Sequence, residues 1–236
     1  MSSFFTKTGF LLAVLALVAA CHTAQHTQNA PSKTIALFDG KTFKGWHNFN
    51  QTGAVKSWTI EDGALVCLGN GGGGHAGDLV TDAEYENFEL SWDWKITKGG
   101  NSGVMYHVVE GAKYKAPHET GPEYQMIDDI GFPGKLEEWQ KTGADYAMNL
   151  PNNQKKVKPV GEWNTSKIIF NKGAVEHWLN GEKIIAFQAW NDNWTKDKTT
   201  GKWKDYPDYG MAKKGRIALQ DHGNKVYFKQ IKIKVL

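Results

Sequence analysis

The segment Asn87–Thr97 reads NFELSWDWKIT, and it decides the fold class. Large apolar side chains occur at every second position, and polar side chains occupy most positions between them. This alternation is typical of a β-strand with one face on a hydrophobic core and the other in solvent. We therefore expect a core strand here. Its inward-facing residues are Phe88, Leu90, Trp92, Trp94 and Ile96.

Further short apolar segments occur on both sides of this strand, separated by turn residues. Asp62-Gly63 and Asn180-Gly181 each lie between two such segments, and these dipeptides favour the two-residue turns of β-hairpins. Helical patterns are almost absent, apart from a short turn expected at Lys135–Lys141. About ten strands with turns between them predict an all-β sandwich of two antiparallel sheets.

A candidate site lies in Gly121–Asp129, which reads GPEYQMIDD. In an extended strand Glu123 and Gln125 share one face, while Tyr124 and Met126 share the other. A carboxylate beside a carboxamide is suited to bind or act on a ligand with many hydroxyl groups. The alternative is an edge strand whose Glu and Gln side chains simply face water.

Other polar residues are expected near this pair. If the preceding strand, Val104–Val109, lies beside it, then Asn101 and His107 meet Glu123 and Gln125. Gln220 and His222 lie at or near the turn of the last hairpin, where side chains are able to face a cleft.

The chain is rich in aromatic residues, with 10 Trp among 236 residues. Several of them lie in the long polar segment Ala189–Gly210, including Trp194. Two interpretations stay open for this segment: its aromatic rings stack on sugar rings, or the segment folds back and buries them.

Charge excludes one class of partner. The formal net charge is only +3, and 28 basic residues are scattered among 25 acidic ones. This distribution has no basic patch of the kind that binds nucleic acid, so no nucleic-acid partner is expected. The sequence leaves the oligomeric state open.

The N-terminal residues predict export. Residues 1–20 contain Lys7 and then an apolar run too short to span a bilayer, as in a signal peptide. VAAC at 18–21 is similar to a bacterial lipobox, so Cys21 is expected to carry lipid. Residues 21–33 then form a flexible tether to one domain at 34–236. His22 after the lipidated cysteine favours an outer-membrane lipoprotein facing the periplasm; the alternative is a cleaved, soluble periplasmic protein.

Several segments together resemble one known family. These are LFDGKTFKGW, YENFELSWDWKITKGGNSGVMYHV, GPEYQMIDD, VEHWLNGEK and GRIALQDHGNKVYFKQIKIK, which extend in order across residues 37–234. The chain is similar to the 3-keto-disaccharide hydrolase domain family. The resemblance implies a concanavalin-like jelly-roll sandwich and action on glycosides already oxidised at C3. The chain lacks the Glu-x-Asp-x-Glu motif of the classical glucanases of that fold, so their two-carboxylate retaining mechanism is not expected.

The implied chemistry is an elimination. A ketone at C3 acidifies the proton at C2, and a base removes it to form an enolate, which expels the group on C1; water adds afterwards. His107 or Glu123 is expected as base, and His222 or the other member of that pair as acid. The remaining candidate side chains are expected to bind the enolate oxygen and the hydroxyls. They are Gln125, Asn101, Gln220, Asp128 and Trp194.

Three alternatives stay open at this point. Asp128, assigned above to substrate binding, alternatively caps a turn with Asp129 or orients a neighbouring residue. A divalent metal ion is a possible electrophile, although no metal-ligand spacing is visible in the sequence. Finally, the same fold hosts sugar-binding modules without catalysis, so a lectin-like module or a purely structural domain are the rival hypotheses to an enzyme.

Overall fold

The structure is a computed structural model that describes residues 1–3, 33–70 and 77–236. The chain divides into two units, Met1–Pro31 and Ser32–Leu236. Within the described residues no helix is both long and apolar enough to cross a bilayer. The signal segment, the lipidation site Cys21 and nearly all of the tether lie outside the described residues, so these three stay predictions.

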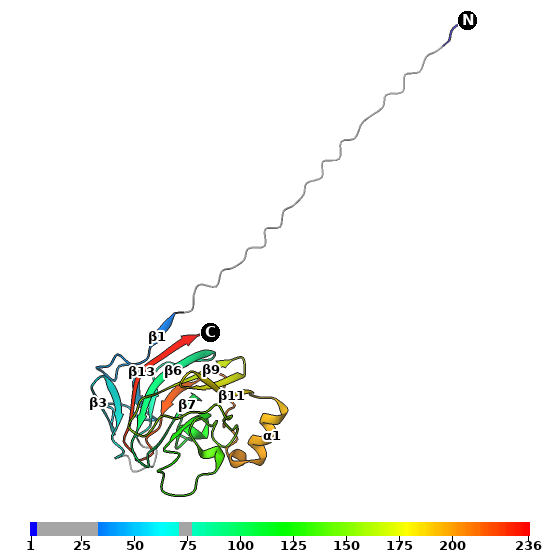
Figure 1. The fold of residues 1–236 in the computed structure, drawn as a ribbon. Coiled ribbons are helices and arrows are strands. Elements are labelled where there is room, and N and C mark those ends of the chain that lie inside the picture. Colours follow the sequence, from blue (N-terminus) through cyan, green and yellow to red (C-terminus); the bar gives the residue numbers. More distant parts are fainter. Residues whose placement is uncertain (4–32, 71–76) are drawn as a thin grey trace. The chain divides into compact units, whose positions relative to one another are not determined.

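The unit that ends at Leu236 consists of two antiparallel sheets (Figure 1). The larger sheet has the strand order β11-β10-β9-β6-β13-β4-β3, and β1 also pairs with β13. Its strands are β1 (Thr34–Ala36), β3 (Trp58–Glu61), β4 (Ala64–Cys67), β6 (Phe88–Ile96), β9 (Asn164–Asn171), β10 (Ala174–Leu179), β11 (Glu182–Gln188) and β13 (Val226–Val235).

The smaller sheet has the order β2-β5-β12-β7-β8. Its strands are β2 (Trp46–Asn48), β5 (Leu79–Thr81), β7 (Asn101–Val108), β8 (Glu123–Ile127) and β12 (Arg216–Leu219). Successive strands repeatedly change sheet, as from β4 to β5, from β5 to β6 and from β12 to β13. The predicted fold class, an all-β jelly-roll sandwich of two antiparallel sheets, is confirmed.

The core lies between the two sheets. In β6 buried and half-buried residues alternate without exception, so the prediction from Asn87–Thr97 is confirmed. The ring of Trp92 lies edge-on to Tyr124 of β8, with centroids 5.1 Å apart, and its Nε1 donates to Met126 Sδ at 3.4 Å. Because β8 belongs to the other sheet, these contacts join the two layers. They also fix which face of β8 is internal.

The two hairpins predicted at Asp62-Gly63 and Asn180-Gly181 are present. The last expected hairpin is absent, because β12 and β13 lie in different sheets. Asn180 and Gly181 connect β10 to β11 with φ values of 50° and 91°, and Asp62 and Gly63 connect β3 to β4 with 49° and 74°. Positive φ at both central residues matches the twist of the flanking strands, which is why Asn-Gly and Asp-Gly are favoured there.

Short helices occur in the connections. They are η1 (Pro117–Glu119), η2 (Glu138–Gln140), α1 (Asp192–Thr200) and η3 (Lys202–Asp205). The long segment 189–210 is therefore largely helical rather than an irregular loop. Asn191 caps α1, because its side chain accepts the backbone N–H of Trp194 at 2.8 Å. Figure 1 shows α1 at the periphery of the sandwich.

Candidate active site

The site is built on the outer face of the smaller sheet. Since Tyr124 and Met126 face the core, Glu123 and Gln125 project from the opposite face of β8. Both are buried, with 4% and 3% of their surface exposed. β8 is the last strand in the sheet order, but the segment around Ala144 covers its edge: Gln125 N–H donates to Ala144 O at 3.0 Å. The interpretation of a solvated edge strand is therefore wrong.

A glycine makes room for the Glu123 carboxylate. In the β7–β8 register Gly103 pairs with Gln125, and Met105 pairs with Glu123. A Cβ at Gly103 would lie 2.7 Å from Glu123 Cδ and closer still to Oε1. The carboxylate thus lies directly over the Gly103 backbone, where any larger residue would displace it.

Amide side chains surround this carboxylate. Gln220 follows β12 and is held beside β7, because its N–H donates to Gly103 O at 3.0 Å. The side-chain oxygens of Asn101 and Gln220 are buried and have no hydrogen-bond partner among the described residues. Gln125 Oε1 accepts the N–H of Met126 at 3.0 Å, which leaves its Nε2 as a donor. Buried amides with unused capacity are unusual in a folded core, and they are suited to bind a polar ligand.

The opposite wall is aromatic and basic. It consists of His118 on η1, Tyr146, and Lys202, Trp203 and Tyr206 on or next to η3. Lys202 Nζ donates to Tyr146 Oη at 3.3 Å, and Trp203 Nε1 donates to Tyr146 O at 3.1 Å. The His118 ring lies 5.9 Å from the Tyr206 ring and 6.2 Å from the Trp203 ring. These contacts join three separate chain segments into one wall.

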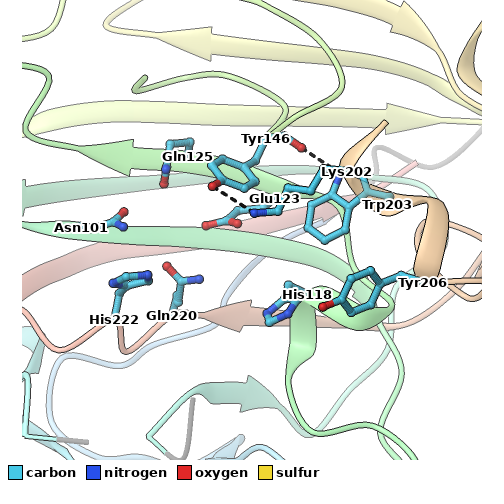
Figure 2. Close-up of a pocket in the computed structure, with 10 residues that line it drawn as sticks. All are labelled: Asn101, His118, Glu123, Gln125, Tyr146, Lys202, Trp203, Tyr206, Gln220 and His222. Carbon is cyan, nitrogen blue, oxygen red and sulfur yellow. Dashed lines mark hydrogen bonds between the residues drawn. The ribbon is translucent and has the colours of Figure 1, made fainter. Parts of the chain in front are cut away.

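Together the two walls enclose a pocket of about 150 Å³ (Figure 2). A carboxylate, Glu123, and two imidazoles, His118 and His222, line the same pocket. These are groups that accept and donate protons in acid–base catalysis. The ten described lining residues are Asn101, His118, Glu123, Gln125, Tyr146, Lys202, Trp203, Tyr206, Gln220 and His222.

Five of the predicted site residues therefore line the same pocket, but His107 does not. The expectation that His107 lies with Glu123 is wrong, because β7 contains a bulge. Met105 to Val108 spans four residues, whereas the partner segment Ala218 to Arg216 spans three. His107 is the residue with φ of 53°, and the extra residue turns its side chain toward the core. Its ring lies 4.4 Å from that of Phe170.

The contacts of His107 are those of a structural residue. Only 1% of its surface is exposed, and its Nε2 lies 2.9 Å from Glu86 O. Burial lowers the pKa of its imidazole, which favours the neutral form.

Asp128 and Trp194 also lie outside the residues that line the pocket. Asp128 accepts the N–H groups of Gly99 and Gly131, both at 2.8 Å, so it organises two turns, which was the alternative left open for it. These hydrogen bonds lower its pKa despite the opposing effect of burial. Trp194 is 6% exposed, and its ring packs over Gly210, where a Cβ would lie 2.8 Å from Trp194 Cη2.

The segment 189–210 folds back and buries several of its aromatic rings, as one of its two interpretations predicts, while stacking on sugar rings stays a prediction. Trp194, Trp203 and Tyr209 are buried, but Trp203 and Tyr206 also line the pocket. Trp203 stacks on Tyr209 at 4.0 Å and 9°. The residues that the sequence did not single out are His118, Tyr146 and Lys202. None belongs to a strand with a periodic pattern. His118 and Lys202 are on η1 and η3, and Tyr146 lies beside β8, where its N–H donates to Glu123 O at 3.0 Å.

A buried carboxylate lies next to the aromatic wall. Asp145 is 1% exposed, and burial raises its pKa to about 7, although Asn149 Nδ2 donates to its Oδ2 at 2.8 Å. Its Oδ1 has no hydrogen-bond partner in the described part of the chain. Asp145 forms a backbone β-bridge with Tyr124, whose side chain faces the core, so Asp145 lies behind the pocket rather than in it.

The described residues offer no ready metal site. Across residues 33–70 and 77–236, no three His, Cys, Asp or Glu side chains are grouped so as to hold a metal ion.

The chain is similar to members of one known protein family. The model of a family described as "3-keto-alpha-glucoside-1,2-lyase-like domain" matches residues 33–234. A protein of Bacteroides thetaiotaomicron named 3-keto-disaccharide hydrolase is 36% identical over 226 residues, which cover 86% of this chain and 78% of that protein.

Two crystal structures from Parabacteroides distasonis are also similar, each of a protein described as a "putative glycosyl hydrolase". One is 50% identical with a TM-score of 0.80 and covers 86% of this chain and 94% of that one. The other is 28% identical with a TM-score of 0.66, and covers 86% and 100%.

Proposed function

Because the chain belongs to the 3-keto-α-glucoside-1,2-lyase-like domain family, we propose that it is a carbohydrate-active enzyme that cleaves the glycosidic bond of 3-keto-glycosides. The observation that carries the proposal is the position of Glu123. Its carboxylate lies over Gly103 in a pocket with two imidazoles, and buried amide groups around it have unused hydrogen-bonding capacity.

The proposed reaction begins at C2 of the oxidised sugar. The Glu123 carboxylate removes the proton from C2, and the electron pair of that C–H bond moves toward the C3 carbonyl to form an enolate. Amide N–H groups of Gln125 and its neighbours donate to the enolate oxygen, which stabilises the developing negative charge. The electrons then form the C1–C2 double bond as the C1–O bond breaks.

An acid must protonate the departing oxygen. His118 and His222 both line the pocket, and we assign this role to one of them. Addition of water across the C1–C2 double bond then gives the free 3-keto sugar, so the net reaction is hydrolysis. If water does not add, the product is the unsaturated ketone and the reaction is that of a lyase.

The test compares a 3-keto-glucoside that carries a chromogenic leaving group with the unoxidised glucoside, with and without a chelator. We expect release from the keto compound alone. Glu123→Gln removes the base at nearly constant shape, and kcat/KM should fall at least ~100-fold. Glu182→Gln, at an exposed position at the start of β11, is the matched control and should retain full activity.

Other results of this experiment would contradict or change parts of the proposal. Equal activity in Glu123→Gln contradicts the assigned base, and release from the unoxidised glucoside contradicts the elimination. Sensitivity to the chelator would add a metal ion to the mechanism. If neither compound is cleaved but the keto sugar binds, the protein is a lectin-like binding module, which the aromatic wall also suits.

We also propose that the protein is exported and anchored by lipid on Cys21, with its domain in the periplasm. The test is metabolic labelling with an alkyne fatty acid in a bacterial host, followed by membrane fractionation. Cys21→Ser should abolish the label, whereas Cys67→Ala should retain it, because Cys67 is buried in β4. Label in the Cys21→Ser protein, or a soluble unlabelled wild type, contradicts the anchor.

A further inference from the structure

A second hollow lies next to the pocket. Trp139, Ala147 and Met148 form its apolar side, and Asp197 and Thr200 of α1 form a polar rim. Its volume is about 470 Å³, within the range of small-molecule sites, roughly 300–1,000 Å³. Nothing in the reaction proposed above uses this hollow.

Lys202 lines both the pocket and the hollow. Its Nζ donates to Tyr146 Oη at 3.3 Å, and Figure 2 shows its side chain extending toward Tyr146. The Tyr146 ring in turn lies edge-on to Trp139, with centroids 5.2 Å apart. The exposed Lys202 thus borders both spaces, and its pair with Tyr146 lies on the side of the pocket that faces Trp139. A ligand that extends from the pocket over this pair reaches Trp139.

The apolar side of the hollow is held in place by its own backbone. Glu137 and Gln140 form a reciprocal capping box around η2, which carries Trp139. Ala147 has φ of 61°, a left-handed conformation that a residue with a side chain rarely adopts. Such strained residues cluster at active sites and ligand contacts. Here the strained residue and Trp139 line the same hollow.

From this arrangement we infer that the hollow is the subsite for the leaving group of the glycoside, and that it selects leaving groups containing a ring with an apolar face. The ring, either a second sugar or an aromatic ring, stacks on the Trp139 indole. This inference rests on the proposed function, since a leaving group exists only if the neighbouring pocket holds the keto sugar. Asp197 and Thr200 would then meet the hydroxyls of a second sugar.

The experiment compares three 3-keto-glucosides that differ only in the leaving group: methanol, glucose and 4-nitrophenol. In Trp139→Ala we expect KM to rise about tenfold for the two ring-bearing compounds, equivalent to about 1.4 kcal/mol. KM for the methyl compound should stay within about twofold, because methanol is too small to reach the hollow. Met148→Ala should produce a smaller change with the same selectivity. The leaving group with the larger rise identifies which ring the hollow prefers.

Trp163→Ala is the matched control, because Trp163 is also half-buried but does not line the hollow; its ring faces Lys95 and Lys229. Thermal unfolding followed by circular dichroism verifies that each variant is folded. Equal effects of Trp139→Ala on all three compounds, or none, overturn the inference while the proposed function stands. Failure of the wild type to cleave any keto compound overturns both.

Discussion

Gly103 is the residue on which the position of the Glu123 carboxylate depends. In Gly103→Ala the new Cβ would overlap Glu123 Oε1, so the carboxylate must move away from its place over β7. A misplacement of about 1 Å at a reacting group costs on the order of 100-fold in rate. We therefore expect kcat to fall about 100-fold with the keto-glucoside. Thermal unfolding verifies that the variant is folded, and wild-type kcat in the folded variant would contradict the geometry.

Asp145 predicts a dependence of stability on pH. Its pKa is raised to about 7 in the folded protein, whereas an unfolded aspartate titrates near 3.9. Between these two pKa values the folded state binds more protons than the unfolded state. The stability that Asp145 contributes is therefore complete below pH 4 and is lost as pH rises to 7. Asp145→Asn cannot ionise and retains the shape. We expect it to unfold at higher denaturant concentration than the wild type at pH 8, with no such gain at pH 4; an equal difference at both pH values would contradict the assignment.

At the scale of elements, β6 connects the two sheets. Trp92 contacts Tyr124 and Met126 of the opposite sheet and is 1% exposed. Trp92→Ala should lower the free energy of unfolding by about 3–5 kcal/mol, measured by chemical denaturation. The neighbouring Ser91 points to the other face, so Ser91→Ala should change it by less than about 0.5 kcal/mol. Similar losses of unfolding free energy in both variants would contradict the alternating burial of residues along β6.

The bulge in β7 shows how one element changes the composition of a site. A regular strand would place His107 on the face of Met105 and therefore beside Glu123. The bulge instead directs His107 toward Phe88 and Phe170, and two imidazoles from other segments, His118 and His222, line the pocket. The site keeps a histidine beside a glutamate, but the histidine comes from the connections and not from the sheet.

At the scale of the whole molecule, low pH should destabilise the packing of the two sheets through a buried histidine. His177 of β10 is fully buried, with its Nδ1 3.1 Å from Gly143 O and its ring 4.8 Å from that of Tyr124 in the opposite sheet. Burial lowers its pKa to about 4. The stability it contributes is therefore complete above pH 6.5, the value for an unfolded histidine, and is lost as pH falls through 4.

His177→Gln tests this contribution, because glutamine also donates a hydrogen bond but does not titrate. Between pH 6.5 and 4 the free energy of unfolding should fall less steeply in the variant than in the wild type, in urea titrations at several pH values. Parallel curves would show that His177 does not contribute to acid unfolding. Asp145 acts in the opposite direction over the same interval, so the double variant separates the two effects.

Much of the site could be predicted from strand pattern alone. Glu123 and Gln125 share the outer face of β8 because their neighbours Tyr124 and Met126 are apolar, and Asn101 follows from the pairing of β7 with β8. The same argument could not exclude Trp194 from the candidate site residues. The segment that carries it lacks periodicity, and only the cap at Asn191 and the close contact with Gly210 decide that Trp194 is buried.

Local patterns in the sequence predict the sandwich, two of its hairpins and the carboxylate–amide pair of the site, because period-two alternation and Asn-Gly or Asp-Gly turns are local properties of the chain. The tertiary structure alone decided the exclusion of His107, the burial of Trp194, the turn-forming role of Asp128 and the aromatic wall formed by Tyr146, Lys202 and Trp203. Each of these depends on a bulge or on contacts between segments far apart in the chain. Such contacts form only when the two sheets and their connections pack together, so no local pattern of residues records them.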